Sequence, residues 1–307
     1  MRFLAIGECM AELAPVDGVR EFKLGFAGDT FNTAWYLAQV ASDIDVGYLT
    51  AVGDDAISQD MRTFMKDSRI CDTHVQVIAG KTVGLYLIHL NNGERSFSYW
   101  RDDSAARQLA VDEIALGRAV GDADLIYFSG ITLAILDPQS REKLLNALRH
   151  ARAYGITVAF DTNLRPRLWS SPKEMTDTIM EAAAQSDIVL PSYDDEAEWF
   201  GDRDSIATLN RYAEIGADQI VVKNSAQPVL FQNDGQRGAV DVDTVTSVVD
   251  TTAAGDSFNA GVLASVIRND DLISGIRQGC RLAGRVVRHK GALIPIEINL
   301  RRDEVGW

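Results

Sequence analysis

Short apolar runs alternate with longer amphipathic stretches from about residue 105 onward. The runs read LIYFSG at 125–130, TVAFDTN at 157–163, IVLPS at 188–192 and QIVVKN at 219–224. Between them, residues 140–155 and 174–186 carry apolar residues at helical spacing, and Gly155 closes the first of these segments. Strands that alternate with helices in this way are typical of a parallel sheet with helices on both faces.

Polar residues follow directly after these predicted strands. Open α/β sheets bind ligands at the carboxyl ends of their strands, so residues at these positions are candidates for a functional site. They are Asp161, Asn163, Arg165, Ser192 and Lys223.

The first hundred residues follow a different pattern. RFLAIGE at 2–8 and VGYLTAVG at 46–53 could join the same sheet, whereas TVGLYLIHL at 82–90 and SFSYWR at 96–101 flank NNGE, a strong hairpin turn signal. With residues 10–26, this hairpin could form a small second sheet that stands off the main one. We therefore expect one α/β domain over 1–307, a doubly wound and mostly parallel sheet with helices on both faces. A small β-sheet lid would form discontinuously from about 10–27 and 80–103.

Composition and charge narrow the function classes. The chain has 307 residues, 46% of them hydrophobic, which is enough for one large core. Its formal net charge of -14 argues against nucleic acid as a partner. The first apolar residues reach Gly7 too early for a signal peptide, and no later run approaches ~18 apolar residues, so we expect a cytoplasmic protein that binds no membrane. The cysteines and histidines show no zinc-site spacing.

Residues 250–262 carry the clearest chemical signal. They read DTTAAGDSFNAGV and continue as a periodic apolar stretch. Small residues at 253–255 let the backbone approach a ligand closely, and the following helix start directs free N–H groups and the positive dipole end toward that point. An anion such as a transferring phosphoryl group suits this place. Asp256 could act there as a base, or it could be an ordinary N-cap.

This segment closely resembles the C-terminal signature of the ribokinase-like (PfkB) carbohydrate kinase family, usually met as DTxGAGD. The resemblance implies that Asp256 is the catalytic base and that the backbone of Ala253, Ala254 and Gly255 forms an anion hole. Ala253 stands where glycine is commoner, and it would be strained if the position required a positive φ. The Ala-Ala form is similar to that of the 2-keto-3-deoxygluconate kinases within the family.

The resemblance extends over nearly the whole chain. Residues 26–34, FAGDTFNTA, resemble the family's Gly-Gly-Asp/Asn stretch, which implies that Gly28, Asp29 and Asn32 contact sugar hydroxyls; Ala27 replaces the first glycine. Residues 52–56, VGDDA, match the N-terminal signature, whose later glycine is replaced by Ser58.

Three stretches resemble those that line the sugar-acid site of the ketodeoxygluconate kinases. They contain Tyr86, the run Tyr99-Trp100-Arg101, and residues 161–169 with Asn163 and Arg165. The resemblance implies that Tyr86, Tyr99, Arg101, Asn163 and Arg165 bind substrate. A guanidinium offers a planar fork to a carboxylate, so Arg101 and Arg165 could hold an acid from two sides. The alternative for each arginine is a solvated surface position.

Nucleotide contacts are less sharply defined. Residues 223–226, KNSA, resemble the family's Lys-x-Gly-x stretch near the ATP phosphates, and residues 279–291 occupy the place of the adenine-side helix, although their basic residues could equally form a solvated face. The expected ATP-binding residues are Arg165, Ser192, Lys223, Ser225, Ala254, Gly255 and Gly284. Residues 192–196, SYDDE, resemble a degraded Asn-x-x-Glu element that organises Mg²⁺ through water, and the sequence leaves Asp195 and Glu196 open for that role.

The resemblance implies an ATP- and Mg²⁺-dependent kinase that phosphorylates the terminal hydroxyl of 2-keto-3-deoxygluconate and forms a homodimer or a higher homo-oligomer through its lid sheet. Two alternatives remain open: a kinase of the same family acting on another sugar, such as fructose or a different ketodeoxy acid, and a sugar-binding sensor without catalysis. No G-x-G-x-x-G follows the first predicted strand and no G-x-x-x-x-G-K-[ST] occurs. These absences argue against a dinucleotide-binding oxidoreductase and a P-loop enzyme.

Overall fold

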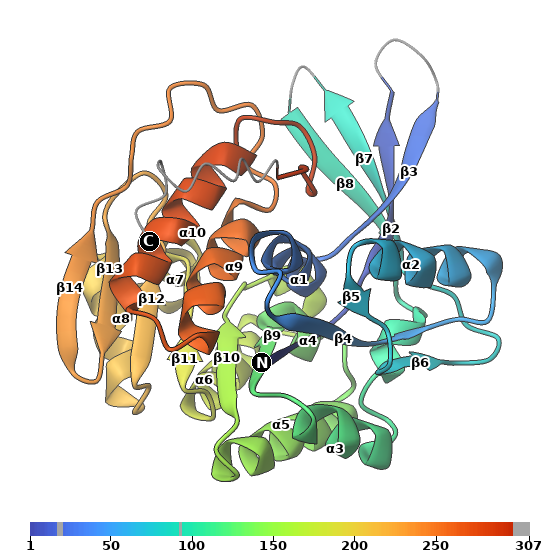
Figure 1. The fold of residues 1–307 in the computed structure, drawn as a ribbon, viewed down its shortest axis with the longest axis horizontal. Helices are drawn as coiled ribbons and strands as arrows, with labels where there is room; N and C mark the ends of the chain where they lie inside the picture. The colour runs from blue at the N-terminus through green and yellow to red at the C-terminus, as the bar shows by residue number, and fades with distance from the viewer. Residues whose placement is uncertain (17–20, 92–93, 297–307) are drawn as a thin grey trace.

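A computed structural model describes residues 1–16, 21–91 and 94–296 of the chain. A large sheet runs through it in the order β14-β13-β12-β11-β10-β9-β1-β4-β5, and β6 also pairs with β4 (Figure 1). The strands are β1 (Arg2–Ile6), β4 (Asp45–Val52), β5 (Ile70–Cys71), β6 (Val75–Val77), β9 (Leu125–Ser129), β10 (Thr157–Asp161), β11 (Ile188–Val189), β12 (Gln219–Val222), β13 (Val229–Asn233) and β14 (Gln236–Val240).

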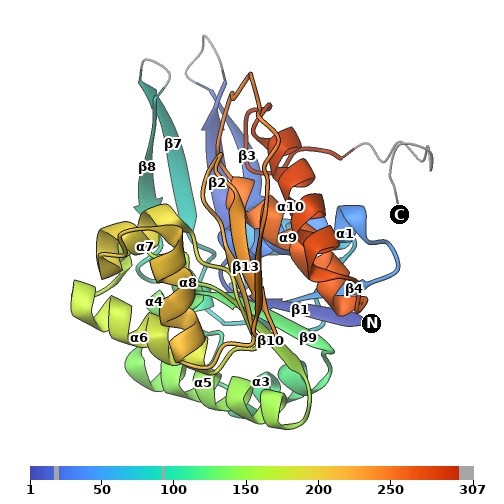
Figure 2. The same cartoon turned by 90° about the vertical axis from the view of Figure 1, so that its left-hand side faces the viewer.

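Helices cover both faces of this sheet (Figure 2). One face carries α1 (Asp29–Val40), α2 (Ala56–Asp67), α9 (Ala254–Ile267) and α10 (Leu272–Val286). The other carries α3 (Glu113–Gly121), α4 (Gly130–Ala134), α5 (Pro138–Ala153), α6 (Pro172–Ala184), α7 (Tyr193–Phe200) and α8 (Ser205–Glu214). Short 3₁₀ turns stand at Ala105–Gln108 and Pro166–Leu168. Strands β1, β4, β5, β6 and β9 to β12 pair in parallel, which confirms the predicted fold class.

The predicted strands begin and end close to their expected bounds, and side chains fix the starts of the helices between them. Asp137 caps α5 by accepting from the N–H groups of Gln139 and Ser140, and Pro138 occupies the first helical position. Ser171 caps α6 in the same way by accepting from Glu174 N–H. The strand-helix alternation therefore places the carboxyl ends of β9, β10, β11 and β12 along one edge of the sheet.

Strands β13 and β14, which form one edge of the large sheet, were not predicted. These two strands pair antiparallel, as do β12 and β13. Asp234 (φ 47°) and Gly235 (φ 79°) form the two-residue connection between β13 and β14. An Asp-Gly pair with positive φ at both positions is the usual tight hairpin turn, so the sequence contained a signal for this element.

A second, small sheet stands off the main one in the order β3-β2-β7-β8 (Figure 1). Its strands are β2 (Met10–Pro15), β3 (Phe22–Ala27), β7 (Leu85–Asn91) and β8 (Glu94–Trp100). The hairpin predicted at NNGE therefore exists, and its central residues 92–93 lie outside the described part of the chain. Side chains on one face of this sheet, among them Met10, Tyr86 and Ile88, pack with Ala292 and against Ala253. The small sheet thus meets the segment that precedes α9.

In the described parts of the chain, none of the helices combines the length and the apolar character that a membrane crossing demands.

Candidate active site

The chain turns sharply at Ala253, immediately before α9 begins. Ala253 has φ 59° and ψ 16°, a left-handed conformation that costs a residue with a side chain about 1–2 kcal/mol. The carboxylate of Asp250 supports the turn by accepting hydrogen bonds from the backbone N–H groups of Thr252 at 3.1 Å and Gly291 at 2.7 Å. Backbone strain of this kind persists only where the surroundings enforce it, and it gathers at functional sites. The strain considered for Ala253 in the sequence is therefore present.

The first turn of α9 presents backbone N–H groups that have no partner inside the helix. Gly255 and Asp256 supply two of these amides. A Cβ atom built on Gly255 would lie 3.9 Å from Nζ of Lys223, so an ammonium group lies beside the same turn. Amides, the helix dipole and a lysine together make this turn suitable for an anion.

Asp256 lies on this first turn and meets the start of α1. Its Oδ2 accepts a hydrogen bond of 2.8 Å from Nδ2 of Asn32. On α1, the Oδ2 atom of Asp29 accepts from Ser129 Oγ at 2.5 Å and from Asn163 Nδ2 at 2.8 Å. The structure therefore brings together Asp256, Asn32, Asp29 and Asn163, all of which the sequence had assigned to sugar binding or catalysis.

The surroundings of Asp256 favour its protonated form. Burial is the main cause and the nearby carboxylate of Asp29 is the second; together they raise the pKa of Asp256 to about 8, although the bond from Asn32 opposes the shift. Burial also raises the pKa of Asp29. A carboxyl group whose pKa lies near the working pH can both take up and release a proton, as a general base must do.

A buried network supports the floor of this site. Nζ of Lys223 donates to Oδ1 of Asp161 at 3.0 Å and to Oδ1 of Asn259 at 3.2 Å. The Nδ2 atom of Asn259 donates to the other Asp161 oxygen at 2.9 Å and to the hydroxyl of Tyr127 at 3.1 Å. Thr33 Oγ1 donates to Tyr127 and to the backbone oxygen of Asp256, both at 3.2 Å. The network joins Lys223, which directly follows β12, to the helix that carries Asp256.

The small sheet contributes aromatic side chains. Tyr86 on β7 pairs in register with Tyr99 on β8, and their ring centroids lie 6.0 Å apart. The Tyr86 hydroxyl donates to Oε2 of Glu12 on β2. Tyr86 belongs to the cluster that packs against Ala253, so the small sheet contacts the turn before α9.

The two arginines predicted to grip a sugar carboxylate have different protein partners. Arg101 is buried, with 8% of its side chain exposed, and forms an ion pair with Glu8. Arg165 is 50% exposed; its Nη1 donates to the backbone oxygen of Leu164 at 2.6 Å and to Oδ2 of Asp195 at 3.2 Å. Their joint action on one carboxylate stays a prediction.

The residues expected to contact the nucleotide lie partly at the edge of the main sheet and partly on helix α10. Ser192 and Lys223 form a parallel bridge at the carboxyl ends of β11 and β12. Ser225 follows with φ 47°, and its hydroxyl donates to Asp194 at 2.8 Å. Gly284 lies on α10, which packs along α9.

The structure separates the two acidic residues considered for magnesium. Glu196 has no exposed side-chain surface, and its carboxylate accepts hydrogen bonds from Thr162 at 2.7 Å, Arg211 at 2.8 Å and Tyr212 at 2.9 Å. Asp195 is 32% exposed and faces Arg165. Protein donors thus occupy Glu196, whereas the oxygens of Asp195 fit a role in Mg²⁺ coordination through water. No cluster of three metal-ligating side chains exists among the residues whose placement is described.

Sequence reasoning assigned no role to several residues of this site. Glu8 and Glu12 hold Arg101 and Tyr86, while Tyr127 and Asn259 hold Asp161. Tyr127 lies in a predicted strand and Glu8 lies at the end of one, and a polar residue at such a position is a signal that could have identified them. Asn259 lies one helical turn after Asp256, and its partners come from distant parts of the chain.

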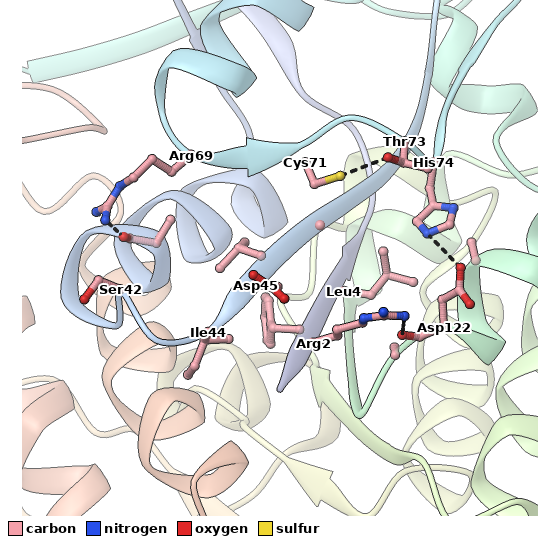
Figure 3. Close-up of a pocket in the computed structure, with 16 residues that line it drawn as sticks. Arg2, Leu4, Ser42, Ile44, Asp45, Arg69, Cys71, Thr73, His74 and Asp122 are labelled. Atoms are coloured by element: carbon pink, nitrogen blue, oxygen red, sulfur yellow. Dashed lines mark hydrogen bonds and ion pairs between the residues drawn. The ribbon is translucent and has the colours of Figure 1, made fainter.

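Two cavities lie away from this cluster. One of about 550 Å³ opens where β1 and β4 begin, at the opposite ends of the strands, and Arg2, Asp45, Arg69, His74 and Asp122 are among its lining residues (Figure 3). Figure 3 shows the His74 ring directed toward Asp122. The other, of about 920 Å³, lies between α3 and α5. Neither cavity contains Asp256, Asn32 or Lys223.

The sequence and the fold are similar to those of known proteins. A family model described as "pfkB family carbohydrate kinase" matches residues 2–299. A protein of Haemophilus influenzae named 2-dehydro-3-deoxygluconokinase is 39% identical over 297 residues, covering 94% of each chain. The protein of the same name from Escherichia coli K12 is 38% identical over 305 residues, covering 96% of this chain and 98% of its own. The crystal structure of a PfkB protein from Polaromonas sp. JS666 superimposes with a TM-score of 0.81 at 25% identity, covering 93% of this chain and 95% of its own.

Proposed function

This chain belongs to the pfkB family of carbohydrate kinases, and we propose that it transfers the γ-phosphoryl group of ATP to the terminal hydroxyl of 2-keto-3-deoxygluconate. The product is 2-keto-3-deoxy-6-phosphogluconate. The bacterial relatives named above support the substrate, since 2-dehydro and 2-keto denote the same carbonyl group. The observation that carries the proposal is the hydrogen bond from Asn32 to Asp256, because it joins the sugar-binding stretch to the base and the anion turn.

Asp256 would accept the proton of the sugar hydroxyl as the oxygen attacks the phosphorus atom. Its carboxylate lies on the same helical turn whose amides face the transferring group, so the nucleophile and the phosphoryl group would be held side by side. Phosphoryl transfer needs in-line positioning and charge stabilisation more than covalent help. The turn at 253–255 and the ammonium of Lys223 would supply this stabilisation.

The nucleotide would lie across the carboxyl ends of β11 and β12. Ser192, Lys223 and Ser225 gather there, and Gly284 on α10 would border the adenine side. Mg²⁺, when bound with ATP, supplies neutralising charge on the phosphate oxygens. Asp195 is the residue that would hold its water ligands, because Glu196 is occupied by protein donors.

The sugar would lie between the helix starts and the small sheet. Gly28, Asp29, Asn32 and Asn163 would contact its hydroxyls, while Tyr86 and Tyr99 would cover it. The carboxylate would be held by Arg101 and Arg165. The small sheet would act as a lid whose closure excludes water and suppresses hydrolysis of ATP.

Two rival functions make different demands on these residues. A kinase for a neutral sugar such as fructose would leave both arginines without a carboxylate partner, and a kinase for another ketodeoxy acid would still use them. A sensor without catalysis would not need the base. Asp256, with a pKa placed near neutrality by its surroundings, favours the enzyme over the sensor.

The same proposal extends to the partners and the cellular location. The protein would bind ATP and a sugar acid, form a homodimer through the small sheet, and work in the cytoplasm, where ATP is available. Neither nucleic acid nor a membrane is a proposed partner.

A coupled assay of ADP release across sugars and sugar acids tests the function directly. We expect turnover with 2-keto-3-deoxygluconate to exceed that with fructose by at least about 100-fold in kcat/KM, the scale of a lost charge-assisted contact. Equal turnover with fructose would point to a neutral-sugar kinase. Binding of the sugar without any turnover would point to the sensor.

A further inference from the structure

A carboxylate and a guanidinium are buried together where the small sheet joins the main sheet. Glu8 follows β1, and Arg101 follows β8, so the pair connects the two sheets across 93 residues of sequence. Only 1% of the Glu8 side chain and 8% of the Arg101 side chain are exposed. Charged side chains buried this deeply are rarely stable without a partner, so removal of either residue would leave an uncompensated buried charge.

Both oxygens of Glu8 are occupied. Oε2 accepts from Nη2 of Arg101, and Oε1 accepts from Oγ of Ser104 at 2.5 Å. Gly84 leaves room for the pair, because a Cβ atom there would lie 2.7 Å from Oε1 of Glu8 and 3.3 Å from Cβ of Arg101. The position of the carboxylate is therefore fixed by two donors and by packing.

The guanidinium of Arg101, in contrast, is only partly satisfied. Its Nε atom is buried and has no hydrogen-bond partner among the described residues. A buried charged donor without an acceptor is unfavourable, so the described protein groups satisfy this guanidinium only in part and Glu8 is its main anchor. Cζ of Arg101 lies 5.9 Å from the ring centroid of Tyr99. Tyr99 pairs with Tyr86, which packs toward Ala253, so Arg101 borders the proposed sugar site.

We propose that Glu8 is a positioning residue that fixes Arg101 for the carboxylate of the sugar acid and so contributes to the choice of an acidic substrate. The inference rests on the proposed function, because it concerns the recognition of that substrate. Glu8 holds Nη2 of the guanidinium and so fixes where the arginine lies at the border of the proposed sugar site. Holding the flexible arginine in place before binding removes an entropy cost that the substrate would otherwise bear.

Glu8 has a second electrostatic effect with the opposite sign. Its negative charge lowers the attraction of Arg101 for another carboxylate. Positioning outweighs this repulsion because a buried arginine without its internal partner would turn toward water and lose its alignment. The two effects predict opposite changes in KM when the charge of Glu8 is removed, which makes the sign of that change decisive.

A double-mutant cycle of Glu8→Gln and Arg101→Ala tests the inference, with steady-state kinetics on 2-keto-3-deoxygluconate at saturating ATP. We expect Glu8→Gln to raise KM about 10-fold and to change kcat far less, and Arg101→Ala to raise KM more. The double variant should match Arg101→Ala, because Glu8 acts through the arginine. A lower or unchanged KM in Glu8→Gln, or independent effects that multiply in the double variant, would overturn the inference.

Thermal unfolding of each variant separates positioning from a general loss of stability. If Glu8→Gln does not fold, Glu8→Asp replaces it, since it keeps the charge but withdraws the carboxylate by one methylene group. Glu8→Asp should also raise KM, and an unchanged KM contradicts the inference. Failure of the wild-type protein to phosphorylate the sugar acid would remove the proposed function itself. Wild-type turnover with a cycle that shows no coupling removes only the role of Glu8.

Discussion

The side-chain amide of Asn32 donates a 2.8 Å hydrogen bond to the carboxylate of Asp256, which lies 224 residues away in sequence. Each residue lies in the first turn of its own helix, α1 or α9, and these helices pack against each other. The contact unites two motifs that the sequence showed separately. It also fixes the orientation of the carboxylate and stabilises its charged form.

Replacing Asp256 with Asn should leave the fold intact and abolish most of the activity. The amide has the same shape but cannot take a proton, so we expect kcat to fall by about 10²–10⁴, the usual contribution of a general base. Steady-state kinetics measure the loss, and nucleotide binding by calorimetry is the control, since it should change little. Activity within a few-fold of wild type would exclude Asp256 from the mechanism.

The pH profile of kcat/KM should report the ionisation of Asp256. A general base must be deprotonated to act, and the surroundings raise the pKa of Asp256 to about 8. At pH 7 about one molecule in ten would carry the charged form, so activity should rise with pH through a midpoint near 8. A profile that is flat between pH 6 and 9 would contradict this assignment.

Two variants should move that midpoint in opposite directions. Asn32→Ala removes a hydrogen bond that lowers the pKa of Asp256, so the midpoint should rise. Asp29→Asn removes a neighbouring negative charge that raises the pKa, so the midpoint should fall. Both residues are also proposed sugar contacts, but a uniform loss of binding changes the height of the profile and leaves its midpoint in place.

Much of this fold was readable from the sequence because its elements depend on local signals. The apolar runs at 125–130 and 157–163 correspond to β9 and β10, and Gly155, with φ 86°, ends the segment between them as expected. Strand β6 and the hairpin of β13 and β14 were not predicted. Strand β6 has only three residues, too few for a periodic pattern.

The site was predictable only where a motif carried it. Asp256 and Asn32 were both assigned from their own segments, yet neither segment shows that the side chains touch. Glu8 was not assigned at all, because its role depends on Arg101, which follows a strand of the other sheet 93 residues later. Ion pairs between distant segments leave no periodic trace in a single sequence, which is why the sequence suggested a free arginine where the structure shows a paired one.

Replacing Asp195 should change the Mg²⁺ requirement of the enzyme, whereas replacing Glu196 should change the stability of the fold. Asp195→Asn should raise the Mg²⁺ concentration for half-maximal activity by about 10-fold, the lower end of the range for residues that support a metal. Glu196→Gln should instead lower stability by about 1–3 kcal/mol, since it weakens buried hydrogen bonds to a charged partner. Magnesium titrations and thermal unfolding of both variants make the comparison. The reverse pattern would assign magnesium to Glu196.

The small sheet should mediate dimer formation. The face opposite to Tyr86 carries Phe22, Leu24 and Trp100, which share one side by strand register and are all exposed. Apolar side chains gathered on one surface are typical of an interface. We expect a homodimer in sedimentation at micromolar concentration and a shift toward monomer in Leu24→Lys. Ile206→Lys, which changes an exposed apolar residue on α8, is the matched control. A wild-type monomer would contradict the prediction.

Replacing Arg165 with Leu tests whether the protein prefers acidic sugars for the reason proposed. If the guanidinium binds the sugar carboxylate, kcat/KM for 2-keto-3-deoxygluconate should fall by an amount set by a lost charge-assisted contact. Breaking a fully buried pair costs about 2–5 kcal/mol. The Arg165 side chain is half exposed, so solvent screening places the expected loss near the lower end, at about 2 kcal/mol or ~30-fold.

The decisive quantity for Arg165 is the ratio of the losses for an acidic and a neutral sugar, because this ratio cancels damage to ATP binding or to closure of the small sheet. The loss for the neutral sugar should be small. Arg165→Lys should restore activity only in part, since an ammonium keeps the charge but not the planar fork. Asp195→Asn, measured at saturating Mg²⁺, is the matched control, because it removes the charged partner of Arg165 and keeps the arginine. Equal losses for both sugars would show that Arg165 serves the nucleotide or the fold, and the acidic substrate would then depend on Arg101 alone.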